Sequence, residues 1–240
     1  MSKNYVIIVA GGTGSRMNSQ LPKQYLLLGE RPVLMHTIEQ FSIAGSAPEI
    51  IVVIHPTMHD TWNVLCAEHG FKVPHTVIYG GQTRFQSVKR GLEKIVEFEK
   101  EHLEKIVIAV HDAARPVIDV RLIDESFEQT RRLGATVLAV NSTNSVRFGT
   151  IDRNEAVNRD DVWIVQTPQT FRGDILHKAF KQNEHPSFTD DASVVEKLGY
   201  TINLIPGDYR NIKITYPEDI RVAQYYIESL ALGSSTNDSE

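Results

Sequence analysis

A glycine-rich loop directly after the first apolar run constrains this chain more than any other feature. Residues 5–9 are apolar and β-prone, which predicts a buried first strand. Glycine occupies three of the next five positions, so the backbone can turn sharply and approach a ligand closely. Successive N–H groups in such a loop form a concave anion site. Arg16 and Lys23 add two cations and Pro22 stiffens the return, so we predict phosphate binding rather than a plain structural turn.

Two familiar nucleotide motifs do not fit this loop. A dinucleotide-binding fingerprint requires a third glycine at position 17, which is Met17 in this chain. A P-loop requires Gly-Lys followed by Ser or Thr, and this run occurs nowhere in the sequence. A nicotinamide-dependent oxidoreductase and a P-loop nucleotidase are therefore disfavoured.

Composition narrows the class of protein. The 240 residues, of which 41% are hydrophobic and 23% charged, suit one globular domain. A net charge of −5 argues against nucleic-acid or membrane partners. The single cysteine, Cys66, excludes an intrachain disulfide and fits a reducing compartment. The first apolar run is too short for a signal peptide, so we expect a soluble, cytoplasmic protein with a disordered tail at residues 233–240.

Apolar, β-branched runs alternate with amphipathic stretches along most of the chain. The runs lie at residues 5–9, 50–54, 76–79, 106–110, 136–140 and 201–205, and the amphipathic stretches at 33–44, 58–69, 85–100, 121–133, 173–181 and 191–198. Pro217 and the two acids that follow it predict the start of a last helix. Strands apolar on both faces are typical of a parallel sheet covered by helices. We therefore predict an α/β fold: a single Rossmann-like domain over residues 1–232, with a mostly parallel sheet flanked by helices.

One polar segment, at about residues 144–167, interrupts this alternation. It contains β-prone residues, among them Val146, Phe148 and Trp163, and it carries Gly149. We interpret it as a β-arm that projects from the sheet, with an ordinary solvated hairpin as the alternative.

Two further loops carry arginine at the predicted ends of strands. They are residues 80–84 and residues 111–116. Ligands of open α/β sheets bind beyond the carboxyl ends of the strands. We expect these loops and the glycine loop to meet at one site.

Six motifs in order resemble the signature of the cytidylyltransferases that activate sugar and polyol phosphates. They read AGGTGSRM with PKQY, GGQTR with SV, HDAARP, TPQ, TDDA and NIKIT, and the match spans residues 5–226. The resemblance implies that a polyol phosphate oxygen attacks the α-phosphorus of CTP and releases pyrophosphate. It implies 2-C-methyl-D-erythritol 4-phosphate as the polyol, for isoprenoid precursor synthesis. Ribitol 5-phosphate remains the alternative, because its cytidylyltransferases share most of these motifs.

The resemblance also implies roles for residues of this nucleotidyltransferase domain. Arg16 and Lys23 would neutralise charge on the phosphates, and Lys213, in a strand ending before Pro217, would position the polyol phosphate. Mg²⁺ would arrive with CTP. Asp112, in a loop, would contact polyol hydroxyls and reach the ion through water, with direct ligation of the ion left open. A loop-capping role paired with Arg115 is the alternative. The remaining implied substrate contacts are Ala10, Gly11, Gly12, Gly14, Gly81, Arg84, Ser87, Ala113, Arg115, Ser145 and Thr167.

The arm has its own implied role. In the family the arm packs against the second subunit of a homodimer. Its arginine, here Arg159, completes the polyol-phosphate site of that subunit. Asn144 and Ser145 stand where the family usually has Asp-Thr; Ser145 keeps a hydroxyl, but the change leaves the choice of polyol open. A catalytically silent nucleotide-binding scaffold is the last alternative, and the presence of Arg16, Lys23 and Asp112 argues against it. His111 is expected to be a packed loop residue, since an ionised phosphate nucleophile needs no general base.

Overall fold

A seven-stranded sheet forms the centre of the molecule, in the order β11-β7-β10-β6-β1-β4-β5. The computed structural model describes residues 3–12, 21–99 and 102–234. Only β10 is antiparallel to its neighbours within this sheet; the other pairings are parallel. The strands are β1 Asn4–Ala10, β4 Glu49–Ile54, β5 Thr76–Tyr79, β6 Val107–Asp112, β7 Ala135–Asn141, β10 Trp163–Arg172 and β11 Asn203–Pro206.

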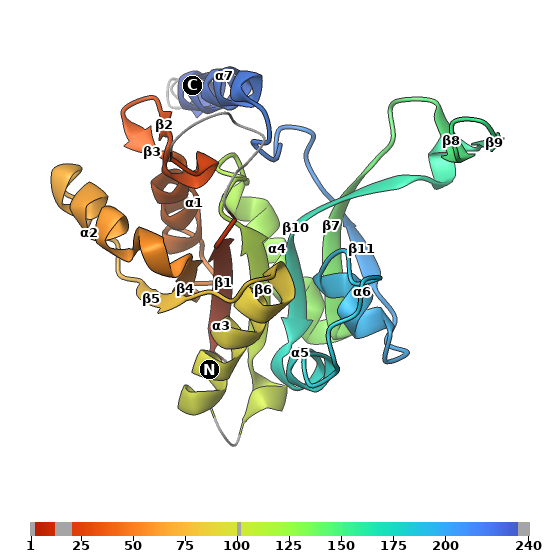
Figure 1. Ribbon diagram of the computed structural model, residues 1–240, viewed down its shortest axis with the longest axis horizontal. Coiled ribbons are helices and arrows are strands. Elements are labelled where there is room, and N and C mark those ends of the chain that lie inside the picture. Colours follow the sequence, from red (N-terminus) through yellow and green to blue (C-terminus); the bar gives the residue numbers. More distant parts are fainter. Residues whose placement is uncertain (1–2, 13–20, 100–101, 235–240) are drawn as a thin grey trace, which may run out of the picture.

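Helices cover both faces of the sheet (Figure 1). They are α1 Val33–Ser42, α2 His59–Glu68, α3 Arg84–Phe98, α4 Val120–Leu133, α5 Gly173–Ala179, α6 Asp191–Glu196 and α7 Pro217–Ser234. Alternate residues of a strand point to opposite faces. Accordingly, Val6 and Ile8 of β1 pack in one buried cluster with residues of α1, α2 and α4, whereas Tyr5 and Ile7 pack in a second with residues of α3, α5 and α6. This double burial explains why the strand is apolar throughout.

The helix α3 packs unusually close to the sheet, and this contact positions its first turn. A Cβ added at Gly91 would lie 2.7 Å from Cγ2 of Ile7, so only glycine allows this approach. Thr83 caps the helix, because its side chain accepts a hydrogen bond from the N–H of Gln86 at 3.1 Å. The start of α3 is thus held at the carboxyl end of the sheet.

The predicted α/β architecture is confirmed, and each predicted helix and apolar run overlaps a helix or strand of the structure. One expectation needs correction: residues 163–165, placed in the arm, pair with β7, and β10 lies in the middle of the sheet. The ladder between β10 and β7 shifts register between Val165 and Gln169.

A hairpin projects from the body at the far end of β10, as predicted (Figure 1). It consists of β8 Val146–Gly149 and β9 Asn154–Val157, which pair antiparallel. Its apolar side chains are open to solvent: Phe148 is 72% exposed and Ile151 95%. Its dimerising role stays a prediction.

The last helix, α7, reaches Ser234 and so includes the first two residues of the predicted tail; residues 235–240 lie outside the described part of the chain. A small hairpin of β2 Leu27–Leu28 and β3 Arg31–Pro32 shares a third buried cluster with α7. Among the described helices, none is long and apolar enough to cross a membrane.

Candidate active site

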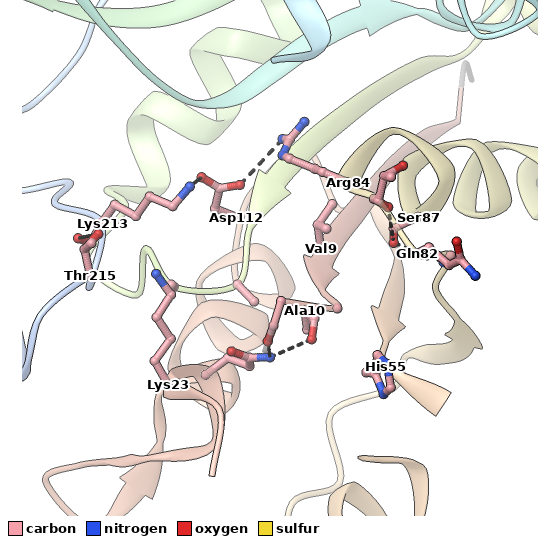
Figure 2. A pocket seen from close by; sticks show the side chains of 17 residues that line it. Val9, Ala10, Lys23, His55, Gln82, Arg84, Ser87, Asp112, Lys213 and Thr215 are labelled. Atoms are coloured by element: carbon pink, nitrogen blue, oxygen red, sulfur yellow. Dashed lines mark hydrogen bonds and ion pairs between the residues drawn. The ribbon is translucent and has the colours of Figure 1, made fainter. Parts of the chain in front are cut away.

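A pocket of about 400 Å³ lies at the carboxyl ends of the central strands. Figure 2 shows side chains from widely separated parts of the chain around it, among them Lys23, Arg84 and Lys213. Its described lining consists of Val9, Ala10, Gly11, Gly12, Lys23, Gln24, His55, Gly81, Gln82, Thr83, Arg84, Ser87, Asp112, Ala113, Ala114, Lys213 and Thr215. The glycine loop and the two arginine-bearing loops therefore meet at one site, as the sequence predicts.

The described part of the glycine loop is held by a single buried side chain. Gln24 is 3% exposed, and its Nε2 donates to the carbonyl oxygens of Ala10 at 2.7 Å and Gly12 at 2.9 Å. Both amide hydrogens are thus used to fix the loop backbone. Lys23, the preceding residue, lines the same pocket. Gly14 and Arg16 lie outside the described residues.

The second loop is built around Ser87, which is 2% exposed. Its Oγ accepts a hydrogen bond from the N–H of Gly81 at 3.1 Å and donates to the carbonyl of Thr83 at 2.9 Å. A Cβ at Gly81 would overlap the Cβ of Gln86. The motif therefore needs glycine at this position for packing, and the turn it forms lines the pocket.

Asp112 ends β6 and faces three cations, in a strand rather than the predicted loop. Its Oδ2 lies 2.8 Å from Nζ of Lys213 and 3.6 Å from Nε of Arg115, and its Oδ1 lies 3.5 Å from Nη2 of Arg84. Burial raises the pKa of the Asp112 carboxyl, but Arg84, Lys213 and Arg115 outweigh burial and hold that pKa well below its usual range. The carboxylate is therefore ionised at neutral pH, and its predicted pairing with Arg115 is one of three.

Arg84 is bound to a buried carboxylate as well as facing the pocket. Its two terminal nitrogens donate to Asp191 at 2.8 and 2.7 Å. Burial lowers the pKa of Arg84, but Asp191 and Asp112 outweigh burial and raise that pKa above its ordinary value. Arg84, which the sequence predicts to contact the substrate, is thus already paired with Asp191 and Asp112.

The residues behind Asp112 hold it in place. Thr167 is 4% exposed, and its Oγ1 accepts a hydrogen bond from the N–H of Asp112 at 3.1 Å and lies 3.1 Å from Nδ1 of His111. Burial lowers the pKa of His111 to about 4, so its ring is neutral at pH 7. His111 is packed as predicted, although it lies in β6 rather than a loop. Thr167 and Arg115 support Asp112 and do not themselves line the pocket.

Lys213 reaches Asp112 from an irregular segment, and not from the predicted strand. Two hydrogen bonds tie this segment to the loop after β6. The N–H of Ile214 donates to the carbonyl of Ala114 at 2.8 Å, and Nη1 of Arg115 donates to the carbonyl of Asn211 at 2.7 Å. Tertiary contacts therefore position Lys213.

The two arm residues of the predicted site lie apart from this pocket. Ser145 and Arg159 are both exposed, and neither belongs to the lining. Arg159 lies 3.9 Å from Asp160 and donates to the carbonyl of Thr143 at 3.5 Å. Within one chain the structure does not bring them to Asp112.

Few metal-binding side chains face the described part of the pocket. Among the described residues there is no group of three His, Cys, Asp or Glu side chains arranged to hold a metal. Asp112 supplies the one carboxylate in the described lining. Mg²⁺ usually keeps several waters and takes one or two carboxylates beside substrate phosphates. The described lining thus offers one carboxylate toward such an ion.

Gln24 and Asp191 each hold a residue or loop of the site, and neither received a role from the sequence. Gln24 stood in a recognised motif, but the target of its side chain is set by the turn of the loop. Asp191 also lies in one of the six motifs. The sequence feature that could have drawn attention to it is the pair of acids at the start of a predicted helix.

Comparisons with known proteins identify relatives over nearly the whole chain. Residues 4–229 match the family model of IspD, 2-C-methyl-D-erythritol 4-phosphate cytidylyltransferase. The enzymes of that name from Bacteroides fragilis and Azobacteroides pseudotrichonymphae are both 42% identical to the chain; the alignments cover 90% and 95% of this chain and 96% and 100% of theirs.

Solved structures show the same fold. A 4-diphosphocytidyl-2C-methyl-D-erythritol synthase superposes with a TM-score of 0.78 at 30% identity, over 95% of this chain and 100% of that one. The Francisella tularensis 2-C-methyl-D-erythritol 4-phosphate cytidylyltransferase gives 0.76 at 31% identity, over 94% and 100%. With the glycine loop, Asp112 and Lys213 gathered in one pocket, the chain belongs to the 2-C-methyl-D-erythritol 4-phosphate cytidylyltransferase family.

Proposed function

We propose that this protein is a cytoplasmic enzyme that transfers CMP from CTP to 2-C-methyl-D-erythritol 4-phosphate. The products are 4-diphosphocytidyl-2-C-methyl-D-erythritol and pyrophosphate, in isoprenoid precursor synthesis. The observation that carries the proposal is the pocket itself. It joins a glycine loop suited to phosphates with an ionised carboxylate, Asp112, beside three cations.

The reaction is an in-line displacement at the α-phosphorus of CTP. A phosphate oxygen of the polyol forms the new P–O bond, and the bond from the α-phosphorus to the oxygen bridging it to the β-phosphorus breaks. Such transfers depend on positioning and on charge stabilisation. The backbone of Ala10, Gly11 and Gly12 is suited to hold the triphosphate, and Lys23, with Arg16, to neutralise the charge that grows on it.

The polyol end of the pocket uses Asp112 and Lys213. An ionised carboxylate accepts hydrogen bonds from hydroxyl groups, and Asp112 is held ionised by its cations. Lys213 is 42% exposed although it contacts Asp112 at 2.8 Å, so its ammonium can also meet a phosphate. Gly81 and Ser87 would face the base and ribose.

Neither a resident metal nor a general base enters this scheme. The polyol phosphate is already ionised at neutral pH, and the neutral ring of His111 is buried. Mg²⁺ carried with CTP would be met by Asp112 through water, and its charge would offset that of the phosphates.

The arm supports a proposal about assembly. We infer a homodimer in which Arg159 and Ser145 complete the partner's polyol site, because neither residue lines the pocket of its own chain. A two-stranded hairpin with exposed Phe148 and Ile151 is marginal alone and gains stability by packing on a second copy.

Incubation of the purified protein with CTP, Mg²⁺ and each polyol phosphate tests the activity. We expect pyrophosphate release with 2-C-methyl-D-erythritol 4-phosphate, and much slower release with ribitol 5-phosphate or with UTP and ATP. The Lys23→Ala protein, purified in parallel, excludes a contaminating activity. Faster release with ribitol 5-phosphate would favour the second candidate, because the change at Ser145 leaves the choice of polyol open. No release with any polyol would overturn the proposal in favour of a silent nucleotide-binding protein.

A further inference from the structure

The buried carboxylate of Asp191 lies directly behind the pocket. It accepts both terminal N–H groups of Arg84, Nη1 to Oδ1 at 2.8 Å and Nη2 to Oδ2 at 2.7 Å. The side chain of Asp191 is 1% exposed, whereas that of Arg84 is 32% exposed. Arg84 thus reaches the pocket and Asp191 does not. A planar, two-point pair of this kind fixes the direction of the guanidinium as well as its distance.

Asp191 is itself anchored on both sides. It is the first residue of α6, whose cap, Asp190, forms a reciprocal pair of hydrogen bonds with Ser193. The side chain of Gln169 in β10 donates to Oδ2 of Asp190 at 2.9 Å and accepts from the N–H of Ala192 at 2.8 Å. These bonds attach the start of α6 to the central sheet, so Asp191 presents its oxygens from a rigid support.

The same guanidinium continues toward Asp112. Nη2 of Arg84 lies 3.5 Å from Oδ1 of Asp112, whose other oxygen meets Lys213 and Arg115. The charges therefore alternate from Asp191 to Arg84 to Asp112. Arg84 approaches Asp112 at Oδ1, whereas Lys213 and Arg115 approach it at Oδ2.

We propose that Asp191 is a positioning residue: it holds Arg84 against Asp112 and thereby sets the orientation in which Asp112 meets the polyol. This inference rests on the proposed function of the pocket. Without the charge of Asp191, the guanidinium is free to turn toward the triphosphate bound in the same pocket. Oδ1 of Asp112 then loses its cation, and Asp112 loses its fixed orientation.

The Asp191→Asn variant tests this directly, because asparagine keeps the shape and removes the charge. Hydrogen bonds to charged groups contribute about 1.5–3 kcal/mol, which corresponds to a loss of about 10- to 100-fold in kcat/KM for the polyol phosphate. We expect the KM for CTP to change less than about 2-fold or to fall, because a released arginine favours the triphosphate. Asp191→Glu, which keeps the carboxylate, should recover part of the loss.

A matched control separates this effect from the loss of any Asp–Arg pair. Asp174 also binds an arginine at two points, Arg172, at 2.6 and 2.9 Å, but neither residue lines the pocket. Asp174→Asn should leave both KM values unchanged. A loss in Asp191→Asn that falls equally on CTP and the polyol phosphate, or that Asp174→Asn reproduces, would overturn the proposal.

A double variant keeps the test valid if Asp191→Asn folds poorly. Arg84→Gln with Asp191→Asn removes both charges together, so no buried charge is left unpaired. If Asp191 acts through Arg84, the double variant has the kcat/KM of Arg84→Gln alone. A kcat/KM of the double variant that equals the product of the two single losses would contradict the inference.

A crystal structure of the Asp191→Asn protein gives a readout that needs no turnover. An inactive wild-type protein would show that the proposed function is wrong. The crystal structure tests the positioning of Arg84 separately, whether or not the protein is active. We expect the Arg84 guanidinium to leave Asp112. A guanidinium that keeps its place beside Oδ1 of Asp112 would refute the positioning role.

Discussion

Replacing Gln24 by glutamate would invert the interaction that holds the glycine loop. The two side chains have nearly the same shape, but an ionised carboxylate has no hydrogen to donate. In the native protein Nε2 donates to the carbonyls of Ala10 and Gly12 at 2.7 and 2.9 Å, and the side chain is 3% exposed. The variant would place a buried negative charge against two carbonyl oxygens.

The size of the effect follows from these contacts. Two lost hydrogen bonds cost about 1 kcal/mol each, and unpaired buried groups add about 1–3 kcal/mol each. Protonation of the glutamate limits the penalty, because taking up a proton at pH 7 from a normal pKa of about 4.3 costs about 4 kcal/mol. We therefore expect destabilisation of about 3–5 kcal/mol at pH 7.

The penalty should depend on pH with a defined sign. The folded-state pKa of the new glutamate is raised above its unfolded value of about 4.3, so the variant loses stability as pH rises above that value. Urea unfolding at pH 5 and pH 8 measures this slope. For the folded variant we expect the KM for CTP to rise by more than about 10-fold. The reason is that a charged group left without its hydrogen-bond partner costs more than about 1.4 kcal/mol.

Gln182→Glu is the matched control for this prediction. Nε2 of Gln182 also donates to two carbonyls, of Ala179 at 3.0 Å and of Val194 at 2.9 Å, but Gln182 does not line the pocket. It should lose stability with the same sign of pH dependence, by less because it is only partly buried. Its KM for CTP should not change. A Gln24→Glu protein with wild-type stability and KM at pH 8 would refute the role of Gln24.

Three further predictions concern other parts of the molecule. Asp112→Asn should lower kcat/KM for the polyol phosphate by about 100-fold or more, measured by pyrophosphate release; an unchanged value would remove Asp112 from the site. Mixing Arg159→Ala and Lys23→Ala proteins after subunit exchange should restore about a quarter of wild-type activity, since random pairing gives one working site in half of the dimers; no recovery despite proven exchange would show that Arg159 does not act across subunits. The hydrogen bond from Lys3, at 2.7 Å, lowers the pKa of the Glu99 carboxyl. The Glu99→Gln protein should therefore be less stable than wild type above about pH 4.3, and this difference in stability should vanish as pH falls through the lowered pKa of Glu99. A difference in urea unfolding that does not depend on pH would contradict this.

Local patterns carried much of the information about this protein. A strand whose side chains are buried on both faces of a sheet is apolar along its length. The strands β1, β4 and β6 could therefore be recognised in the sequence as apolar runs. The glycine loop was visible because three glycines fall within four positions directly after an apolar run. The order of six motifs pointed to the family, and the family model over residues 4–229 agrees. These signals are local, and each can be detected within a few residues.

Long-range partners were decided only by tertiary structure. The β-prone stretch around Trp163 pairs with β7, whereas Val146, equally β-prone, pairs within the arm, and nothing in either segment encodes the difference. Arg84 finds Asp191 across 107 positions of sequence. Lys213 reaches Asp112 from an irregular segment that the loop after β6 holds in place. A motif specifies which side chain is present, but the partner it meets depends on how distant segments pack together.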